Sequence, residues 1–360
     1  MVRTLKAIHG GIRKFSTTPS YLSNYGFIGL GQMGRHMARH IYNKLEPHDQ
    51  LYVYDTIPSA TEQFVKEITS AMPSNKGKLV PLKAIDDFVN KVDSQLDFIV
   101  TMVPEGTHVK CVINELVSSY QKQDVDNSST KTTFIDSSTI DIPTSISIHD
   151  FVKSEIPQFD FIDAPVSGGV AGARKGTLSF MLSRKDHDAI SPGLTHLLSK
   201  MGTNIFPCGA KHGSGLAAKL SNNYLLAITN LAVADSFQLA KAFGLNLVNY
   251  AKLVSVSTGK SWASVDNCPI QGAYPKENCL PADAHYEGGF VTKLTRKDLV
   301  LATESARLRN RFLFMGDIGK YWYDKACERE DLANRDLGVL YEWLGNIEVD
   351  EDGNLKEIKK

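Results

Sequence analysis

The residues best suited to chemistry lie in one segment of the chain, residues 213–223. Lys219 and Asn223 are four positions apart, so their side chains share a face of the helix that the sequence predicts there. Their neighbours are mostly apolar, and a poorly hydrated amine has a lowered pKa that suits proton transfer. The pair predicts a general base, Lys219, with Asn223 to orient it or a substrate hydroxyl. A lysine that extends its ammonium into solvent from the helix start is the alternative.

A second group of polar atoms is expected at Ser167, Gly168 and Gly169. A hydroxyl beside two glycines brings several backbone N–H groups to one point, and such a cluster can bind a carboxylate. A plain glycine turn explains the same residues equally well. Lys297 is a third candidate, although a Lys-Asp step on an amphipathic helix usually marks only a solvated face.

A glycine-rich turn follows the first apolar run of the folded chain, residues 26–30. Gly29, Gly31 and Gly34 form G-x-G-x-x-G between a predicted strand and a predicted helix, which is the context in which this pattern binds dinucleotides. Gly29 permits the tight turn, Gly31 lets a pyrophosphate approach the backbone, and Gly34 lets helix and strand pack closely. Free N–H groups at the helix N-terminus then face the phosphates. The same turn contains Leu30, Gln32 and Met33.

Asp55 ends the next predicted strand, residues 51–54. A carboxylate at this place accepts hydrogen bonds from the adenosine ribose and repels a 2′-phosphate, so NAD is favoured over NADP. A glycine turn in a related fold that binds no dinucleotide is the alternative.

The order strand, turn, helix, strand is typical of a parallel sheet. We therefore expect an α/β fold, with an N-terminal Rossmann-type NAD-binding domain at 25–210. An all-α substrate and catalytic domain at 211–345 would follow, entered through a long central helix at 216–243, and then a loose, charged tail at 346–360. Further strands are expected at 96–102, 133–136 and 160–163, further helical segments at 247–257, 291–309 and 312–344, and surface loops at 70–78 and 121–131.

The first 24 residues differ from the rest of the chain. They include four basic residues and several hydroxyl side chains, whereas the first acidic residue of the chain is Glu46. A basic, serine-rich and acid-poor leader is typical of a mitochondrial transit peptide, which predicts a protein of the mitochondrial matrix. An extension without a targeting role is the alternative.

The composition argues against several classes of protein. The chain has 40 basic and 40 acidic residues, a balance that does not favour nucleic-acid binding. No apolar run is long enough for a membrane span. The five scattered cysteines fit a reducing compartment. No metal is expected, because His36 and His40 lack the intervening glutamate and the third ligand of a zinc site; both are expected on a solvated helix face.

Four segments together resemble the β-hydroxyacid dehydrogenase family. Residues 29–37 match its glycine-rich signature, residues 163–173 its substrate signature, and residues 213–223 its catalytic signature. Residues 297–302 match its late K-D-L-x-L-A motif. The resemblance extends over residues 25–340, with the segments in the family's order.

The resemblance implies a role for each candidate residue. Lys219 would be the catalytic residue and Asn223 its partner. The family usually has small residues where this chain has Ser183, Arg184 and Lys185, and we expect this difference to alter the local turn. Substrate-binding positions are matched by Ser167, Gly168, Gly169 and Lys297. Cofactor-lining positions, besides the glycine-rich turn and Asp55, are matched by Val103, Pro104, His108, Thr139 and Lys297.

Residues 286–290 and the region of Trp262 resemble the branch of the family that oxidises 3-hydroxyisobutyrate. This implies NAD-dependent oxidation of that alcohol to methylmalonate semialdehyde, a step of valine catabolism, by a homodimer or homotetramer. Two alternatives stay open. One is a dehydrogenase or reductase of the same family for another short 3-hydroxy acid, of the serine or tartronate semialdehyde type. The other is a non-catalytic NAD-binding interaction protein.

Overall fold

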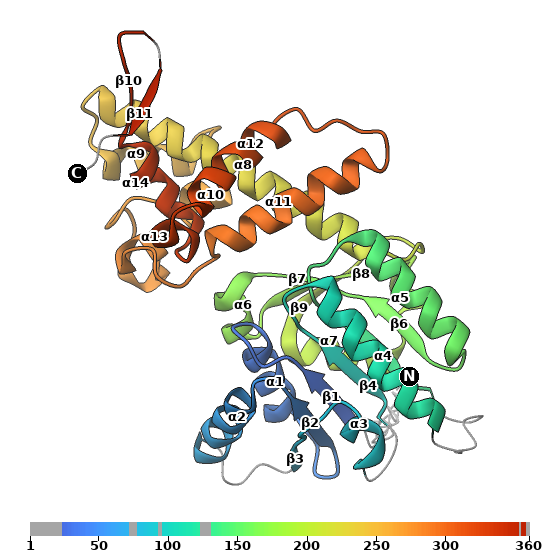
Figure 1. Cartoon of the computed structure of the whole chain (residues 1–360). Coiled ribbons are helices and arrows are strands. Elements are labelled where there is room, and N and C mark those ends of the chain that lie inside the picture. Colours follow the sequence, from blue (N-terminus) through green and yellow to red (C-terminus); the bar gives the residue numbers. More distant parts are fainter. Residues whose placement is uncertain (1–23, 72–77, 93–95, 123–130, 353, 358–360) are drawn as a thin grey trace, which may run out of the picture.

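The fold is taken from a computed structural model, which describes residues 24–71, 78–92, 96–122, 131–352 and 354–357. Most of the expected leader lies outside the described residues, and so do the middle parts of both expected surface loops. Figure 1 shows two parts, a sheet flanked by helices and a mostly helical part. This confirms the expected fold class.

Six parallel strands form the central sheet in the order β3-β2-β1-β4-β5-β6. The chain leaves β1 toward one edge and returns at β4 toward the other, so β1 and β4 are neighbours at the point where the direction reverses. Ligands of such sheets bind outside the carboxyl ends of these two strands. The strands are β1 (Asn24–Ile28), β2 (Gln50–Tyr54), β3 (Lys78–Pro81), β4 (Phe98–Thr101), β5 (Thr133–Asp136) and β6 (Asp160–Asp163).

Helices cover both faces of this sheet, and apolar side chains are buried on each face. One cluster includes Phe27 and Met37, and the other includes Ile99 and Leu116. The alternation of buried strands and helices is what the apolar runs of the sequence predict. The helices are α1 (Gly34–Asn43), α2 (Pro58–Ala71), α3 (Asp87–Asn90), α4 (Gly106–Lys122) and α5 (Ile142–Glu155).

A second, three-stranded sheet joins the two parts, and the sequence did not predict it. Strand β7 (Val166–Ser167) pairs antiparallel with β8 (Leu178–Leu182), which pairs parallel with β9 (Gly202–Pro207). Strand β7 has only two residues, too few to show a periodic pattern. Two helices lie between these strands, α6 (Gly169–Lys175) and α7 (Pro192–Met201).

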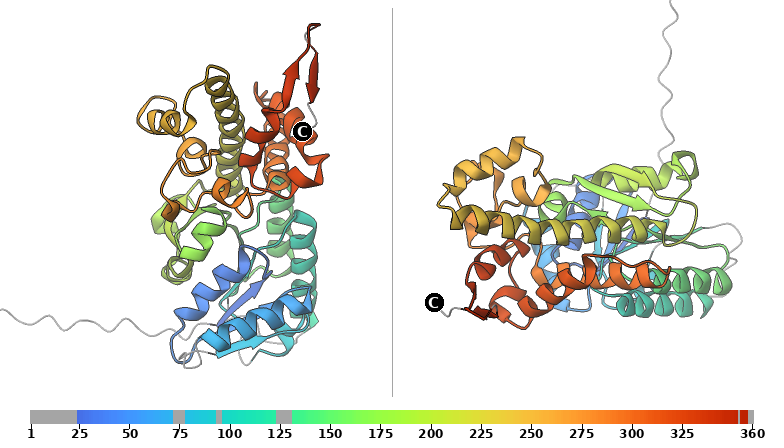
Figure 2. Two further views of the ribbon diagram at one scale, coloured as in Figure 1. Left: turned by 90° about the vertical axis from the view of Figure 1, so that its left-hand side faces the viewer. Right: turned by 90° about the horizontal axis from the view of Figure 1, so that it is seen from above.

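The helical part is built around α8 (Ser214–Ala242), which confirms the long central helix. Figure 2 shows from above that α8 runs beside the orange and red helices of the C-terminal region. Its contacts include α11, α12 and α14. The other helices are α9 (Leu247–Val256), α10 (Trp262–Val265), α11 (Thr292–Arg307), α12 (Gly316–Cys327), α13 (Glu330–Ala333) and α14 (Leu340–Leu344).

The prediction of one helical segment over 312–344 is wrong. The segment divides into α12, α13, a 3₁₀ turn and α14 around the buried side chain of Asp336. Its carboxylate accepts hydrogen bonds from the backbone N–H groups of Phe290 (2.7 Å) and Gly338 (2.8 Å). Such tertiary bonds end a helix that local periodicity alone would continue.

The prediction of a loose C-terminal tail is also wrong for its described residues. Strands β10 (Ile347–Val349) and β11 (Leu355–Glu357) form an antiparallel hairpin. Asp350 organises the turn, because one of its carboxylate oxygens accepts hydrogen bonds from the N–H groups of Asp352 (3.0 Å) and Asn354 (2.8 Å). Within the described ranges, no helix combines the length and apolar character that crossing a bilayer requires.

Candidate active site

The glycine-rich turn lies between β1 and α1, at the carboxyl end of the sheet. Gly29 has a φ of 97°, which favours glycine. A Cβ atom on Gly34 would lie 1.9 Å from the carbonyl oxygen of Gly29, whereas a Cβ on Gly31 would meet no atom within 4 Å. Gly34 is therefore required for close packing, and Gly31 borders open space that a pyrophosphate can fill. The turn fits a dinucleotide in the way its glycines predict.

Asp55 connects the end of β2 to this turn. Its carboxylate accepts hydrogen bonds from the N–H of Leu30 (2.7 Å) and from the N–H of Ile57 (2.8 Å). The charge is thereby held beside the first residues of the glycine-rich turn. This is the place from which a carboxylate can meet an adenosine ribose.

The first turn of α8 is anchored by two side chains of the preceding strands. Asp163 is fully buried, and its two oxygens accept hydrogen bonds from the N–H groups of Gly213 and Leu216, both at 3.0 Å. The hydroxyl of Ser183 accepts a third, from Gly215 (3.0 Å). The departure at Ser183 therefore adds a cap for the helix that holds Lys219.

Removing the Asp163 carboxylate is expected to destabilise the protein. Asp163→Ala leaves two buried N–H groups without acceptors, so we expect the free energy of unfolding to fall by about 3 kcal/mol. Urea unfolding followed by circular dichroism measures the change. Asp141→Ala is the matched control, because Asp141 caps α5 with one bond to Thr144 (2.8 Å) and should cost about 1 kcal/mol. Equal losses in the two variants would contradict the double cap.

Lys219 lies in the second turn of α8 and is only 9% exposed. Burial lowers the pKa of its ammonium to about 8; the Asp298 carboxylate opposes this shift and the Lys297 ammonium adds to it. A lysine with such a pKa exchanges its proton readily near neutral pH. Most of the side chain is thus buried, which favours the general base over a lysine that extends into solvent.

Asn223 lies one turn further along α8 and is also buried. Its side-chain nitrogen donates a hydrogen bond of 2.6 Å to Asp298, and its oxygen accepts one of 3.1 Å from Asn222. The expected contact with Lys219 is thus replaced by a link through Asp298, which acts on the Lys219 ammonium through its charge.

Asp298 is a residue of this candidate site that the sequence analysis missed. It is 3% exposed, although a Lys-Asp step suggests a solvated face. Its spacing from buried Thr295 and Ala302 places all three on the inner face of α11. The three- and four-residue spacing of these positions is the signal that could have identified Asp298 as buried, whereas its charge suggests an exposed residue.

Lys297 connects the helical part to the cofactor side of the sheet. Its ammonium donates hydrogen bonds to the carbonyl oxygens of Thr139 (2.7 Å) and Pro104 (3.3 Å), in the segments that follow β5 and β4. It also lies 3.5 Å from an oxygen of Asp298. Val103 donates its N–H to Ser138 (2.9 Å), which joins the same two segments.

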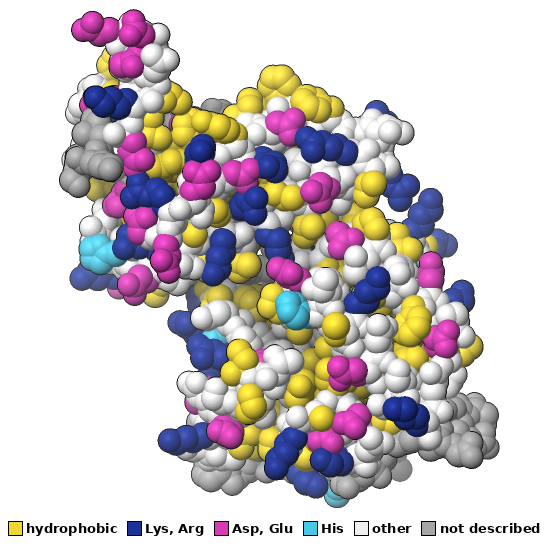
Figure 3. All heavy atoms as spheres, in the orientation of Figure 1, with side chains coloured by type: hydrophobic (Ala, Val, Ile, Leu, Met, Phe, Trp, Pro, Cys, Tyr) yellow, Lys and Arg dark blue, Asp and Glu magenta, His cyan; other side chains and the backbone are white. Residues whose placement is uncertain are grey.

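The remaining predicted residues lie before α8, in the part of the chain that contains the two sheets. Ser167 ends β7, and Gly168 and Gly169 follow with φ values of 129° and 58°, which explains why both are glycine. A Cβ on Gly169 would meet no atom within 4 Å, so this backbone is open to a ligand. His108 is exposed on α4. Figure 3 shows a hollow between the two parts with Lys and Arg side chains around it.

The chain matches two family models and many known proteins. Residues 24–209 match the model described as the NAD binding domain of 6-phosphogluconate dehydrogenase. Residues 213–344 match the model described as NAD-binding of NADP-dependent 3-hydroxyisobutyrate dehydrogenase.

Curated relatives extend over nearly the whole chain. The mitochondrial 3-hydroxyisobutyrate dehydrogenase of Drosophila melanogaster is 33% identical over 330 residues, which cover 91% of each chain. The human mitochondrial enzyme of that name is 32% identical over 90% of this chain and 87% of its own. A solved structure of Mycobacterium tuberculosis 3-hydroxyisobutyrate dehydrogenase with L-serine aligns with a TM-score of 0.74 and 28% identity, over 90% of this chain and 99% of that chain.

Proposed function

Because the chain belongs to the 3-hydroxyisobutyrate dehydrogenase family, we propose that it oxidises 3-hydroxyisobutyrate to methylmalonate semialdehyde, with Lys219 as the general base. The chain is an NAD-binding oxidoreductase, and valine catabolism is the corresponding process. The observation that supports the role of Lys219 best is its burial beside Asp298, with a pKa lowered to about 8.

Residues at the carboxyl end of the sheet would hold the cofactor. The turn from Gly29 to Gly34, including Leu30, Gly31, Gln32 and Met33, would surround the pyrophosphate, and Asp55 would bind the adenosine ribose. When bound, NAD supplies the hydride acceptor. Lining residues further along the sheet would be Val103, Pro104, His108, Thr139 and Lys297.

Residues of this chain would bind the substrate carboxylate and accept the proton of the substrate hydroxyl. Ser167, Gly168 and Gly169 would bind the substrate carboxylate. Lys219 takes the hydroxyl proton at Nζ as the C–H bond gives up its hydride, and the C–O bond becomes a carbonyl. Asn223 would orient Lys219 or the substrate hydroxyl, and Lys297 would contact the substrate and the cofactor. Most of the rate enhancement would then come from orienting the two ligands.

A substrate panel with both cofactors tests the proposal. Purified protein is expected to reduce NAD with 3-hydroxyisobutyrate at a higher kcat/KM than with L-serine or with glycerate, the alcohol that corresponds to tartronate semialdehyde, and to use NADP poorly. A higher kcat/KM for serine would favour the second candidate, a dehydrogenase for another short 3-hydroxy acid. Serine is the acid to test, because the mycobacterial structure contains L-serine. Absence of turnover with every acid would favour the NAD-binding interaction protein.

The proposed function also includes a location in the mitochondrion. Eukaryotic relatives are named mitochondrial, and we propose that residues 1–24 direct this chain to the mitochondrial matrix. A fluorescent protein fused to these residues should enter mitochondria, and neutralising their basic side chains should prevent it.

We also propose domains at 25–210 and 211–345. The boundary lies in the segment between β9, which ends at Pro207, and α8, which begins at Ser214.

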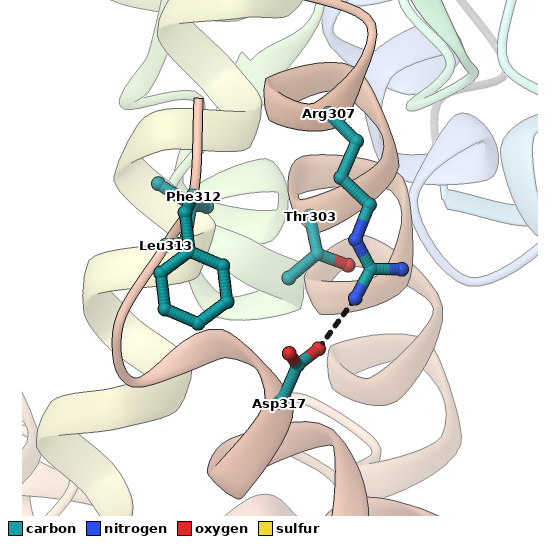
Figure 4. A pocket seen from close by; sticks show the side chains of 5 residues that line it. All are labelled: Thr303, Arg307, Phe312, Leu313 and Asp317. Atoms are coloured by element: carbon teal, nitrogen blue, oxygen red, sulfur yellow. Dashed lines mark hydrogen bonds and ion pairs between the residues drawn. The ribbon is translucent and has the colours of Figure 1, made fainter. Parts of the chain in front are cut away.

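An exposed apolar face supports the proposal of a homo-oligomer. A groove of about 200 Å³ lies between α8 and α12 and is lined mainly by apolar side chains. Leu225, Phe314 and Ile318 stand at this face with 61%, 75% and 49% of their surface exposed. At the end of α11, Phe312 is also exposed beside an ion pair of Arg307 with Asp317 (Figure 4). Large exposed apolar patches usually mark protein interfaces.

A charge placed in this face is expected to separate the subunits. Ile318→Asp should elute as a monomer in size-exclusion chromatography with light scattering, at a concentration where the unmodified protein is a dimer or tetramer, because the carboxylate cannot be buried unpaired. Val256→Asp is the control, since Val256 is exposed at the end of α9 and outside the groove. An unmodified protein that is monomeric would refute the oligomer, and an oligomeric Ile318→Asp would refute this face.

A further inference from the structure

Two short helices meet at the cofactor and substrate turns. Helix α1 starts at Gly34, the last residue of the glycine-rich turn 29–34, which we call the cofactor turn. Helix α6 starts at Gly169, the last residue of the turn 167–169 that would bind the substrate carboxylate, which we call the carboxylate turn. The two helices pack against each other (Figure 1). A contact between them therefore relates the position of one ligand to that of the other.

His40, in the last turn of α1, lies against the C-terminal end of α6. Its Nε2 is 3.0 Å from the carbonyl oxygen of Arg174. A carbonyl can only accept, so Nε2 must be the donor. The last carbonyls of a helix lack partners within the helix, and His40 supplies one. Gly176 ends α6 at a φ of 70°, and a Cβ there would lie 2.8 Å from the imidazole carbon Cε1. The ring thus occupies the space that a side chain at Gly176 would need.

Helix α6 has few other contacts that could fix it. It has seven residues, of which Ala173 is fully buried. His36, one turn before His40, is 6% exposed, so its expected place on a solvated face is wrong. Burial, together with the charges of Arg35 and Arg174, lowers the pKa of His36. The directed bond from α1 to α6 comes from His40.

We propose that His40 is a positioning residue for substrate, because it holds α6 and thereby the carboxylate turn at Gly168 and Gly169. The inference rests on the proposed function of that turn. The cofactor turn at the other end of α1 is held separately, by the close approach of Gly34 to Gly29. Loss of the His40 contact should then weaken binding of the hydroxy acid and leave binding of NAD unchanged.

Steady-state kinetics of three variants test this inference. His40→Ala is expected to raise the KM for 3-hydroxyisobutyrate about fivefold, the effect of one hydrogen bond, with kcat and the KM for NAD within about twofold. His40→Gln keeps an N–H donor at a similar reach and should restore most of the loss. Arg39→Ala is the control on the same helix, because Arg39 pairs with Glu67 (2.9 Å) and makes no bond to α6 that would be lost; its KM values should not change.

Each result separates the inference from the function on which it rests. An unchanged substrate KM in His40→Ala, or an equal rise in the KM for NAD, overturns the role of His40. So does a lack of rescue by His40→Gln when its melting temperature equals that of the unmodified protein. If the unmodified protein turns over no hydroxy acid, the proposed function fails instead. Calorimetric binding of isobutyrate to the NADH complex then gives the same comparison of variants without turnover.

Discussion

Replacing Lys219 by alanine is expected to lower kcat by about 10³-fold, the usual contribution of a general base. The variant loses the buried amine on which the Asp298 carboxylate acts, while the glycine-rich turn at Gly29 to Gly34 stays intact. Binding of NADH, measured by fluorescence titration, should therefore stay within about twofold of the unmodified value. Retained turnover would refute the role of Lys219.

The same residue predicts the pH dependence of the reaction. The pKa of Lys219 is lowered to about 8, and only the neutral amine can accept the hydroxyl proton. The kcat/KM for alcohol oxidation should rise as the pH increases toward 8 and level off above it. Aldehyde reduction needs the ammonium, so its kcat/KM should be level below pH 8 and fall above it. Lys241→Ala is the control, because Lys241 is exposed on the same helix. A profile for oxidation that falls between pH 7 and 9 would contradict this assignment.

Replacing Asp55 by asparagine is expected to lower the preference for NAD over NADP by about 100-fold. The carboxylate repels a 2′-phosphate at short range, and this repulsion is lost when the charge is removed. Asparagine keeps an oxygen that can accept the hydrogen bond from Leu30, so the glycine-rich turn should keep its shape. The ratio of kcat/KM values for the two cofactors, with one substrate, measures the effect.

A control variant that also loses one negative charge shows whether the change of cofactor preference depends on the position of Asp55 or only on the net charge of the protein. Glu62→Gln removes one negative charge from an exposed position on the neighbouring helix α2. Its cofactor ratio should stay within about twofold, since exposed charges are screened within about 10 Å. A similar change of the ratio in both variants would show that the ribose contact is not the cause.

The parts of the fold that the sequence predicted are those with long or repeated patterns. Buried strands alternating with helices identified the parallel sheet, and an apolar stretch without proline or glycine identified α8 within two residues at each end. The three glycines of the glycine-rich turn were informative because each has its own reason: Gly29 has a positive φ, Gly34 packs against Gly29, and Gly31 borders open space. Local sequence is sufficient in these cases.

The features that the sequence did not predict depend on contacts between distant residues. Asp298 and Ser183 look like surface residues, and only the packing of α8 shows that one bonds Asn223 and the other caps the helix start. Asp336 breaks an otherwise helical segment through bonds to distant backbone. Strand β7 exists only because β8 lies beside it. No pattern within a short window of sequence contains this information.

Lys297 gives the molecule a mechanical property. The helix that holds it belongs to the helical part, whereas the carbonyl groups of Thr139 and Pro104 belong to the sheet. Any hinge rotation that widens the space between the two parts has to break both bonds at one ammonium. The side chain therefore couples the separation of the two parts to the loss of two hydrogen bonds.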